Sequence, residues 1–225
     1  MRKLIVAEHI SLDGVIQAPG GPQEDPSDGF RLGGWTAPYP DDLIGKALQE
    51  MFSQPFELLL GRRTYDIWAA YWPHVPAKSG GRPIADKFNS VAKHVATHRP
   101  DSLTWQNSHA LKGDIAEAVR ALKNKSGANL LTWGSGEMLH QLLAAGLVDE
   151  LWLLTYPVII GRGKRLFADN AQASAFKVGR SISAPSGVLI NRYERSGEVR
   201  TGKVGEELEA KASGSKKRSR HSTKK

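Results

Sequence analysis

Two glycine turns constrain the fold of this chain more than any other feature. Each follows a short apolar run and precedes an amphipathic one: Gly61-Arg62-Arg63-Thr64 after residues 56–60, and Gly134-Ser135-Gly136-Glu137 after residues 129–133. A strand that feeds a helix through such a turn leaves unpaired N–H groups at the helix start, where they and the helix dipole favour phosphate. Each glycine alone is mostly a packing solution, but two such turns in one sheet can flank one phosphate-rich ligand.

The rest of the pattern alternates strands with helices. Strands are expected over residues 3–10, 56–60, 91–97, 103–106, 129–133 and 150–156, and helices over residues 41–52, 65–72, 114–123 and 137–145. Two late strands, near residues 175–182 and 188–195, are typical of an antiparallel hairpin. The sequence therefore predicts an α/β three-layer sandwich with a mixed, mostly parallel sheet that ends in an antiparallel hairpin.

Two segments are too rich in glycine and proline to form long regular elements. Residues 14–40 hold six glycines and five prolines, and residues 73–83 form a second loop. A loop as long as the first is usually a functional lid or a disordered segment, and we expect a lid. Trp35, Tyr39 and Trp72 then either stack on a flat ring or close the lid over the core.

The positive charge of the chain is concentrated at its end. The formal net charge is +8, of which six charges lie on Lys216, Lys217, Arg218, Arg220, Lys224 and Lys225. We therefore predict one domain over residues 1–196 and a disordered basic tail over residues 197–225. The absence of cysteine excludes thiolate zinc sites and cysteine nucleophiles and agrees with a cytoplasmic location. No apolar run reaches the roughly 18 residues of a membrane span.

Other motif interpretations fail on spacing. Neither turn matches Gly-x-Gly-x-x-Gly, and Gly161-Arg162-Gly163-Lys164 lacks the spacing and the hydroxyl residue of a P-loop. Ser135 does not fit a nucleophile elbow, because Trp133 stands where that motif requires glycine. His94 and His98 lie four apart in a predicted strand without clustered carboxylates, so we expect solvent-facing histidines and no metal site.

Further polar residues have two interpretations each. Thr97-His98-Arg99 follows a predicted strand and is either a second phosphate-binding group or a solvated strand end. Asp13 is either a turn former or an acid. Asp42 is either a helix N-cap or a proton donor.

Taken in order, several segments resemble the dihydrofolate-reductase-like fold. They are Ser11-Leu12-Asp13-Gly14, the two glycine turns, Leu147-Val148-Asp149-Glu150-Leu151 and Pro157-x-x-x-Gly161-x-Gly163-x-x-Leu166-Phe167. The resemblance covers about residues 2–195. Within that fold, the chain looks like the C-terminal reductase domain of the bifunctional riboflavin-biosynthesis deaminase–reductase and its stand-alone bacterial relatives.

This resemblance implies an NADPH-dependent reductase. It implies that Gly61, Arg62, Arg63 and Thr64 hold cofactor phosphate, that Thr97, His98 and Arg99 hold the adenosine 2′-phosphate, and that Gly134, Ser135, Gly136 and Glu137 meet the pyrophosphate. Pro40-Asp41-Asp42-Leu43 is similar to the Pro-x-Asp-Leu of dihydrofolate reductases, whose aspartate engages the pterin. Asp42 and Asp13 are therefore the catalytic candidates.

The same analogy implies a substrate and an assembly. The substrate would be 5-amino-6-(5-phosphoribosylamino)uracil, with dihydrofolate as the alternative. The enzyme would be a homodimer, with the late strands and Trp152 as interface material. Two interpretations from other classes stay open: a non-catalytic nucleotide-binding protein, and a nucleic-acid-associated protein that uses its basic tail.

Overall fold

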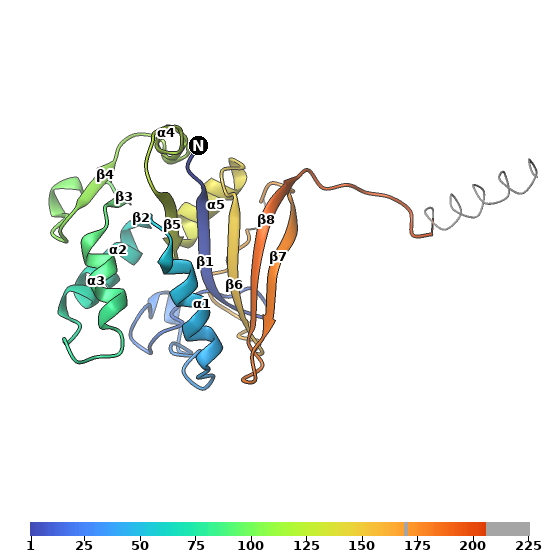
Figure 1. Cartoon of the computed structure of the whole chain (residues 1–225), viewed down its shortest axis with the longest axis horizontal. Helices are drawn as coiled ribbons and strands as arrows, with labels where there is room; N and C mark the ends of the chain where they lie inside the picture. The colour runs from blue at the N-terminus through green and yellow to red at the C-terminus, as the bar shows by residue number, and fades with distance from the viewer. Residues whose placement is uncertain (169–170, 206–225) are drawn as a thin grey trace, which may run out of the picture.

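An eight-stranded sheet lies between two layers of helices in the computed structural model, which describes residues 1–168 and 171–205 (Figure 1). The strands are β1 (Leu4–Ser11), β2 (Phe56–Gly61), β3 (Lys93–Ala96), β4 (Ser108–Leu111), β5 (Asn129–Trp133), β6 (Glu150–Tyr156), β7 (Ala175–Ser183) and β8 (Leu189–Gly197). The helices are α1 (Asp42–Ser53), α2 (Arg62–Tyr71), α3 (Arg82–Ser90), α4 (Ile115–Asn124) and α5 (Gly136–Ala144). Short 3-10 turns cover Ser27–Gly29, Trp72–His74 and Pro100–Ser102.

The strand order places one crevice at the middle of the sheet. The order is β4-β3-β2-β5-β1-β6-β8-β7; β1 to β6 are parallel, whereas β8 pairs antiparallel with β6 and β7 pairs antiparallel with β8. The chain runs outward from β2 to β4 and then returns to insert β5 between β2 and β1. Such a switch leaves a crevice at the carboxyl ends of the strands, where α/β proteins bind ligands. The predicted fold class and the antiparallel ending are confirmed.

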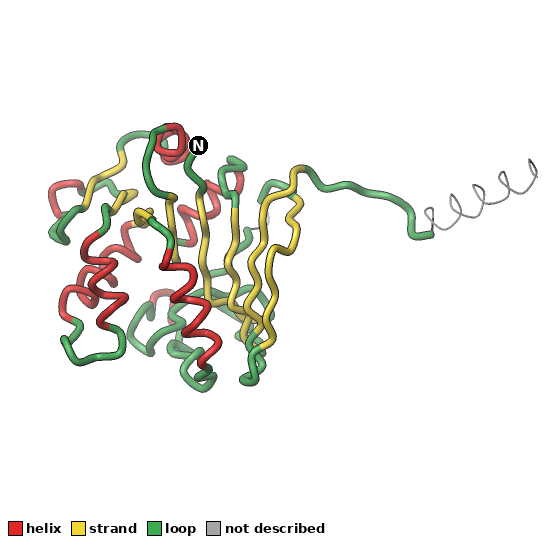
Figure 2. The backbone as a smooth tube through the Cα atoms, in the orientation of Figure 1, coloured by secondary structure: helices red, strands yellow, loops and turns green. Residues whose placement is uncertain are grey.

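Helices cover both faces of the sheet, as the tube in Figure 2 shows. On one face, α1, α2 and α3 bury Phe52, Tyr65 and Phe88 against β2 and β5. On the other face, α4 and α5 bury Val119 and Leu139 in a second cluster with β1. Because the central strands are covered on both sides, they read in sequence as continuous apolar runs.

Two expected elements differ from the structure. Residues 82–90 form α3, although no helix was predicted there: Pro83 suits a first helical turn, and Ala85 and Phe88 face the core three residues apart. The strand expected over residues 103–106 is wrong, and β4 lies at Ser108–Leu111 instead. The main-chain N–H of Trp105 donates to the Tyr65 hydroxyl at 2.8 Å, so that segment is tied to α2 rather than to a neighbouring strand.

The expected role of Trp152 at an interface is also wrong. Its side chain is buried in the core of this chain, and its Nε1–H donates to Glu150 Oε1 at 2.6 Å. The structure describes only the first part of the predicted disordered tail over residues 197–225. Residues 198–205 contain no helix or strand and lead away from the sheet in Figure 1, whereas residues 206–225 lie outside the described residues. Within the described ranges, no helix is long and apolar enough to cross a membrane.

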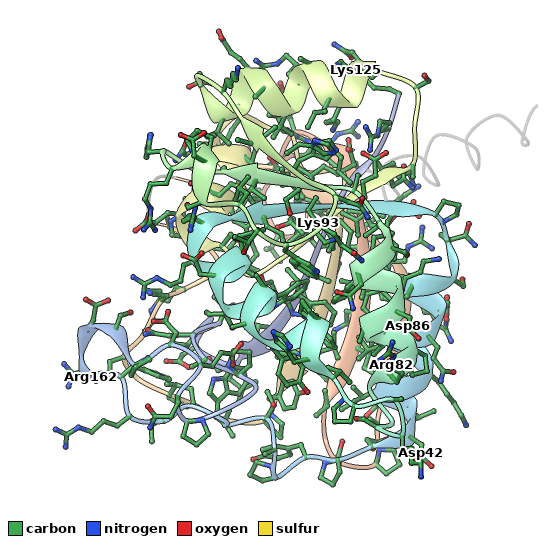
Figure 3. All side chains as sticks on the ribbon, turned by 90° about the vertical axis from the view of Figure 1, so that its left-hand side faces the viewer. Asp42, Arg82, Asp86, Lys93, Lys125 and Arg162 are labelled. Carbon is green, nitrogen blue, oxygen red and sulfur yellow. The ribbon has the colours of Figure 1, made fainter. Side chains whose placement is uncertain are left out.

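Lys93 is a buried cation at the start of β3. Its ammonium donates to the main-chain oxygens of Asn89, Val91 and Gln106 at 3.1, 2.8 and 3.0 Å, and it lies 4.4 Å from the centre of the Trp105 ring. Its side chain is fully buried, and Figure 3 labels it near the middle of the view. Burial lowers its pKa to about 8. The ammonium therefore links α3, β3 and the segment before β4. Its hydrogen bonds to three carbonyl groups offset the free-energy cost of removing the charge from water.

We predict that Lys93→Met destabilises the protein by about 2 kcal/mol, because three carbonyl groups lose their shared donor. Urea unfolding measures the change. Lys46→Met, at an exposed position of α1, is the control and should leave the unfolding midpoint unchanged. A Lys93→Met variant as stable as the control would show that desolvation of the ammonium cancels its hydrogen bonds.

Candidate functional site

A cleft of about 1390 Å³ opens at the carboxyl ends of the central strands. This volume exceeds the roughly 300–1,000 Å³ of an ordinary small-molecule site and suits a long ligand or two ligands side by side. All the predicted cofactor residues line it: Gly61, Arg62, Arg63, Thr64, Thr97, His98, Arg99, Gly134, Ser135, Gly136 and Glu137. Three segments that are distant in sequence therefore meet at one place.

Ser135 fastens the two glycine turns to each other. Its hydroxyl accepts the N–H of Gly61 at 2.7 Å and donates to the Thr64 hydroxyl at 2.9 Å. A Cβ on Gly61 would lie 2.8 Å from the Ser135 side chain, and a Cβ on Gly134 would lie 3.0 Å from Thr64 Oγ1. Both glycines thus have a packing role, which the sequence offered as the alternative interpretation. That packing also brings the starts of α2 and α5 together.

Both helix starts lack a side-chain cap. Gly61 stands at the N-cap of α2 and has no side chain that could accept a hydrogen bond. Ser135, at φ 73°, stands at the N-cap of α5, and its side chain accepts none from the first turn. Ser135 is a common capping residue, but its hydroxyl is engaged with the other turn. The first N–H groups of two helices are therefore available to an anion in the cleft.

Positive side chains surround these helix starts. Arg62 donates to Thr97 Oγ1 at 3.3 Å, to the Arg99 carbonyl at 3.1 Å and to Ser102 Oγ at 2.7 Å. It also pairs with Asp66 at 2.9 Å, and the Arg99 side chain is 68% exposed. Arg62 thereby ties the start of α2 to the Thr97–Arg99 segment, and the two predicted phosphate-binding groups form one surface.

The 14–40 loop reaches the same surface through Asp25. Its carboxylate pairs with Arg63 and with Lys164, each at 2.6 Å. Burial alone would raise the pKa of Asp25, but the hydrogen bonds from Lys164, Ser27 and Arg63 lower it to about 2. Through this carboxylate the 14–40 loop, named the lid below, is joined to two cationic residues of the cleft.

The opposite part of the cleft is aromatic. His9 lies 5.1 Å from Trp133 between ring centroids, Trp133 lies 6.1 Å from Phe52, and Phe52 lies 5.2 Å from Phe88. Trp68 stacks on Phe88 at 4.9 Å and 11°. All five side chains line the cleft, and Trp72 joins them. This aromatic arm, defined by these six residues, provides flat apolar surface, whereas the phosphate-binding residues form a polar arm.

Two ionisable residues of β1, Glu8 and His9, also line the cleft, and neither was predicted as a site residue from the sequence. Burial raises the pKa of Glu8 well above its usual range, the N–H of Gly134 lowers it by a smaller amount, and Glu24 raises it further. Burial lowers the pKa of His9 to about 4, so its ring is neutral at pH 7. Tyr156 Oη lies 3.0 Å from His9 Nδ1. The available signal was a carboxylate and an imidazole inside an otherwise apolar strand.

The structure does not bring Asp13 or Asp42 to this cleft. Asp13 accepts the N–H groups of Ile160 and Gly161 at 3.0 and 2.8 Å and the Ser11 hydroxyl at 2.7 Å. Asp42 is exposed at the first position of α1, and Figure 3 places it at the outer edge of the molecule. The N-cap is Asp41, which accepts the N–H of Leu43 at 2.9 Å. The geometry therefore favours the turn-forming interpretation of Asp13 and leaves Asp42 without cleft contacts.

The remaining candidates divide between core and cleft. Trp35 and Tyr39 pack edge-on against Tyr156, so these two rings close over the core, whereas Trp72 lines the cleft. The expectation that His94 faces solvent is wrong: its Nε2 lies 2.7 Å from Glu57 Oε2, and the side chain is largely buried. His98 lines the cleft. Within the residues that the structure describes, no group of three His, Asp or Glu side chains could hold a metal ion.

Known proteins share this architecture. The model of the RibD C-terminal domain family matches residues 2–190. The protein named Uncharacterized protein YyaP of Bacillus subtilis (strain 168) is 26% identical over 196 residues, which cover 87% of this chain and 96% of that protein.

Two solved structures show the same fold. A pyrimidine reductase-like protein from Corynebacterium diphtheriae superposes with a TM-score of 0.55 at 15% identity and covers 89% of this chain and 93% of its own. A dihydrofolate reductase from Enterococcus faecalis, complexed with NADP(H) and RAB-propyl, superposes with a TM-score of 0.53 at 15% identity and covers 86% and 96%. The predicted dihydrofolate-reductase-like fold is confirmed.

We predict that Asp13→Asn lowers the melting temperature at pH 7. Burial alone would raise the pKa of Asp13, but hydrogen bonds from Ile160, Ser11 and Gly161 lower it to about 2. A carboxyl with a lowered pKa stabilises the folded state above its unfolded pKa of about 3.9, and this contribution is lost as the pH falls through 2. Thermal melts at several pH values should therefore show the two proteins converging below pH 4. An equal melting temperature at pH 7 would refute a stabilising role for the hydrogen bonds that Asp13 accepts from Ile160 and Gly161.

We predict that Ser135→Ala destabilises the protein by about 1–3 kcal/mol, because the Gly61 N–H loses its acceptor. The variant should also weaken the binding of any ligand that needs both turns. Ser108→Ala, whose hydroxyl is buried without a hydrogen-bond partner among the described residues, is the matched control and should be nearly neutral. Equal unfolding free energies for the two variants would remove Ser135 from its bridging role.

Proposed function

The chain belongs to the RibD C-terminal domain family, and on that premise we propose that it is an NADPH-dependent reductase that transfers a hydride to a substrate with a flat heterocycle. The family and its reductase-like neighbours support a reductase. The observation that carries the cofactor assignment is the convergence of two uncapped helix starts and a cationic surface on one cleft. NADPH has the matching chemistry, since it carries a pyrophosphate and a separate phosphate on one adenosine ribose.

The residues of the polar arm fit this cofactor part by part. The starts of α2 and α5, with Arg63 beside them, would hold the pyrophosphate. The Thr97 hydroxyl and the exposed guanidinium of Arg99 would hold the 2′-phosphate. When bound, the cofactor supplies the hydride, and the chain supplies orientation and the exclusion of water. The 14–40 lid serves the second purpose through its Asp25 contacts.

The aromatic arm would hold the substrate ring. Its Trp and Phe side chains present flat faces, and the neutral His9 adds an imidazole at the inner end. By analogy with the family, the first substrate to test is 5-amino-6-(5-phosphoribosylamino)uracil. Dihydrofolate is the second candidate, because a dihydrofolate reductase shares the fold.

The location and the oligomeric state of the enzyme follow from the same family resemblance. We expect a cytoplasmic homodimer, with a contact surface that excludes the buried Trp152. A role in nucleic-acid binding would rest on the basic residues beyond position 205, and deletion of residues 206–225 together with a salt-dependent DNA-binding assay tests it.

We predict that NADPH binds with micromolar affinity and more tightly than NADH. Trp68, Trp72 and Trp133 line the cleft, so the quench of tryptophan fluorescence reports binding of either nucleotide. Arg99→Ala should weaken NADPH binding about tenfold through the loss of one charge-assisted contact and leave NADH binding unchanged.

Arg120→Ala, at an exposed position of α4, is the matched control and should alter neither affinity. Equal loss of NADPH and NADH affinity in Arg99→Ala would contradict the placement of the 2′-phosphate. Failure of the wild-type protein to bind either nucleotide would remove the cofactor from the proposal altogether.

A further inference from the structure

Glu8 differs from every other buried Asp, Glu, Lys or Arg side chain in the described part of the protein. The others each have a counter-charge or several hydrogen bonds: Arg2 pairs with Glu57, Asp25 with Arg63, Lys123 with Asp149 and Glu150 with Arg192, and Lys93 donates to three carbonyl groups. Glu8 is 2% exposed and has a single hydrogen bond, from the Gly134 N–H to Oε1 at 2.6 Å. A buried carboxylate without a counter-charge is costly, and the usual outcome is that the group keeps its proton.

The charges around Glu8 act in the same direction. The electrostatic neighbour of its carboxyl is Glu24 of the 14–40 lid, which is a like charge. The next residue of β1, His9, is neutral at pH 7 because burial lowers its pKa to about 4. Two cations of the cleft that contact the lid, Arg63 and Lys164, are paired with Asp25. Among the described residues, burial and the charge of Glu24 therefore favour the neutral acid, and the Gly134 N–H favours the ionised form.

The position of Glu8 is at the border between the two arms of the cleft. In the parallel β1–β5 pairing Ala7 lies opposite Trp133. The next residues of the two chains, Glu8 and Gly134, therefore also lie side by side. Trp133 belongs to the aromatic arm, and Gly134 begins the turn of the polar arm. A ring in the first arm and a nicotinamide held from the second would meet at this border. Glu8 lines the cleft there.

We propose that Glu8 is a catalytic residue that enters the reaction as a neutral carboxylic acid and gives its proton to the substrate. This proposal rests on the proposed reductase function. The proton passes from the Glu8 carboxyl to the nitrogen or oxygen of a C=N or C=O bond, while the carbon of that bond takes the hydride from the reduced nicotinamide. The substrate gains two electrons, the nicotinamide is oxidised, and the carboxylate left on Glu8 recovers its proton from water.

The test begins with the protonation state, which needs no turnover. Infrared difference spectra between the wild-type protein and Glu8→Gln at pH 7 should contain one protonated-carboxyl C=O band that the variant lacks. Gln keeps an oxygen for the Gly134 N–H, so the turn is retained. Glu117→Gln, at an exposed position of α4, is the control and should not remove the band.

The second step is single-turnover oxidation of NADPH with whichever of the two candidate heterocycles is reduced. Glu8→Gln should lower the rate at pH 7 by about 100-fold or more and leave NADPH binding unchanged. The wild-type rate should fall as the pH rises and Glu8 ionises, and the variant should lack this dependence.

The outcomes separate the two proposals. An ionised Glu8, or an unchanged rate in Glu8→Gln, in a protein that binds NADPH would overturn the catalytic role alone. Loss of NADPH binding in Glu8→Gln would make Glu8 a support of the turn and would also overturn it. A wild-type protein that binds no nicotinamide nucleotide would overturn the reductase function itself, whatever the spectra show.

Discussion

The contact on which the site depends is the one between the Ser135 hydroxyl and the turn that precedes α2. Its two hydrogen bonds, to the Gly61 N–H and the Thr64 hydroxyl, join β2–α2 to β5–α5 across neighbouring strands. Because this hydroxyl is used between the turns, it does not cap α5, and the first N–H groups of the helix stay available. A single side chain therefore both fixes the spacing of two helix starts and leaves them open to an anion.

That arrangement divides the cleft by chemistry. The starts of α2 and α5, Arg62 and Arg99 make one arm cationic. The rings of the other arm come from α1, α2, α3, the turn at Trp72–His74, β1 and β5. The lid adds a constraint to the polar arm, because Asp25 already satisfies Arg63 and Lys164. An anion that reaches Arg63 must compete with this carboxylate, so binding in the polar arm and the position of the lid are coupled through one side chain.

Local signals explain which parts of this arrangement the sequence could predict. A glycine turn between an apolar run and an amphipathic run is readable over about ten residues, and both turns lie in the cleft as a result. The nine-residue α3 was not predictable in the same way, because Pro83 opens a helix here but also signals a loop. Asp13 and Asp42 were ambiguous because one short carboxyl serves turns, caps and catalysis equally well, and only the contacts of Asp13 with residues 160 and 161 distinguish these roles.

Glu8 was beyond such reasoning, because its burial is a long-range property. The N–H that it accepts lies 126 residues away in sequence, and the like charge beside it comes from the lid. In the sequence alone, a glutamate in a strand looks the same whether it faces solvent or a closed cleft. Elsewhere in the described structure the buried charges are compensated, which is the rule for charges that serve only the fold. A buried carboxyl with one hydrogen bond lowers the stability of the fold, and no structural contact compensates for this loss. Its position between a phosphate-binding turn and an aromatic surface is where a catalytic acid would contact a substrate.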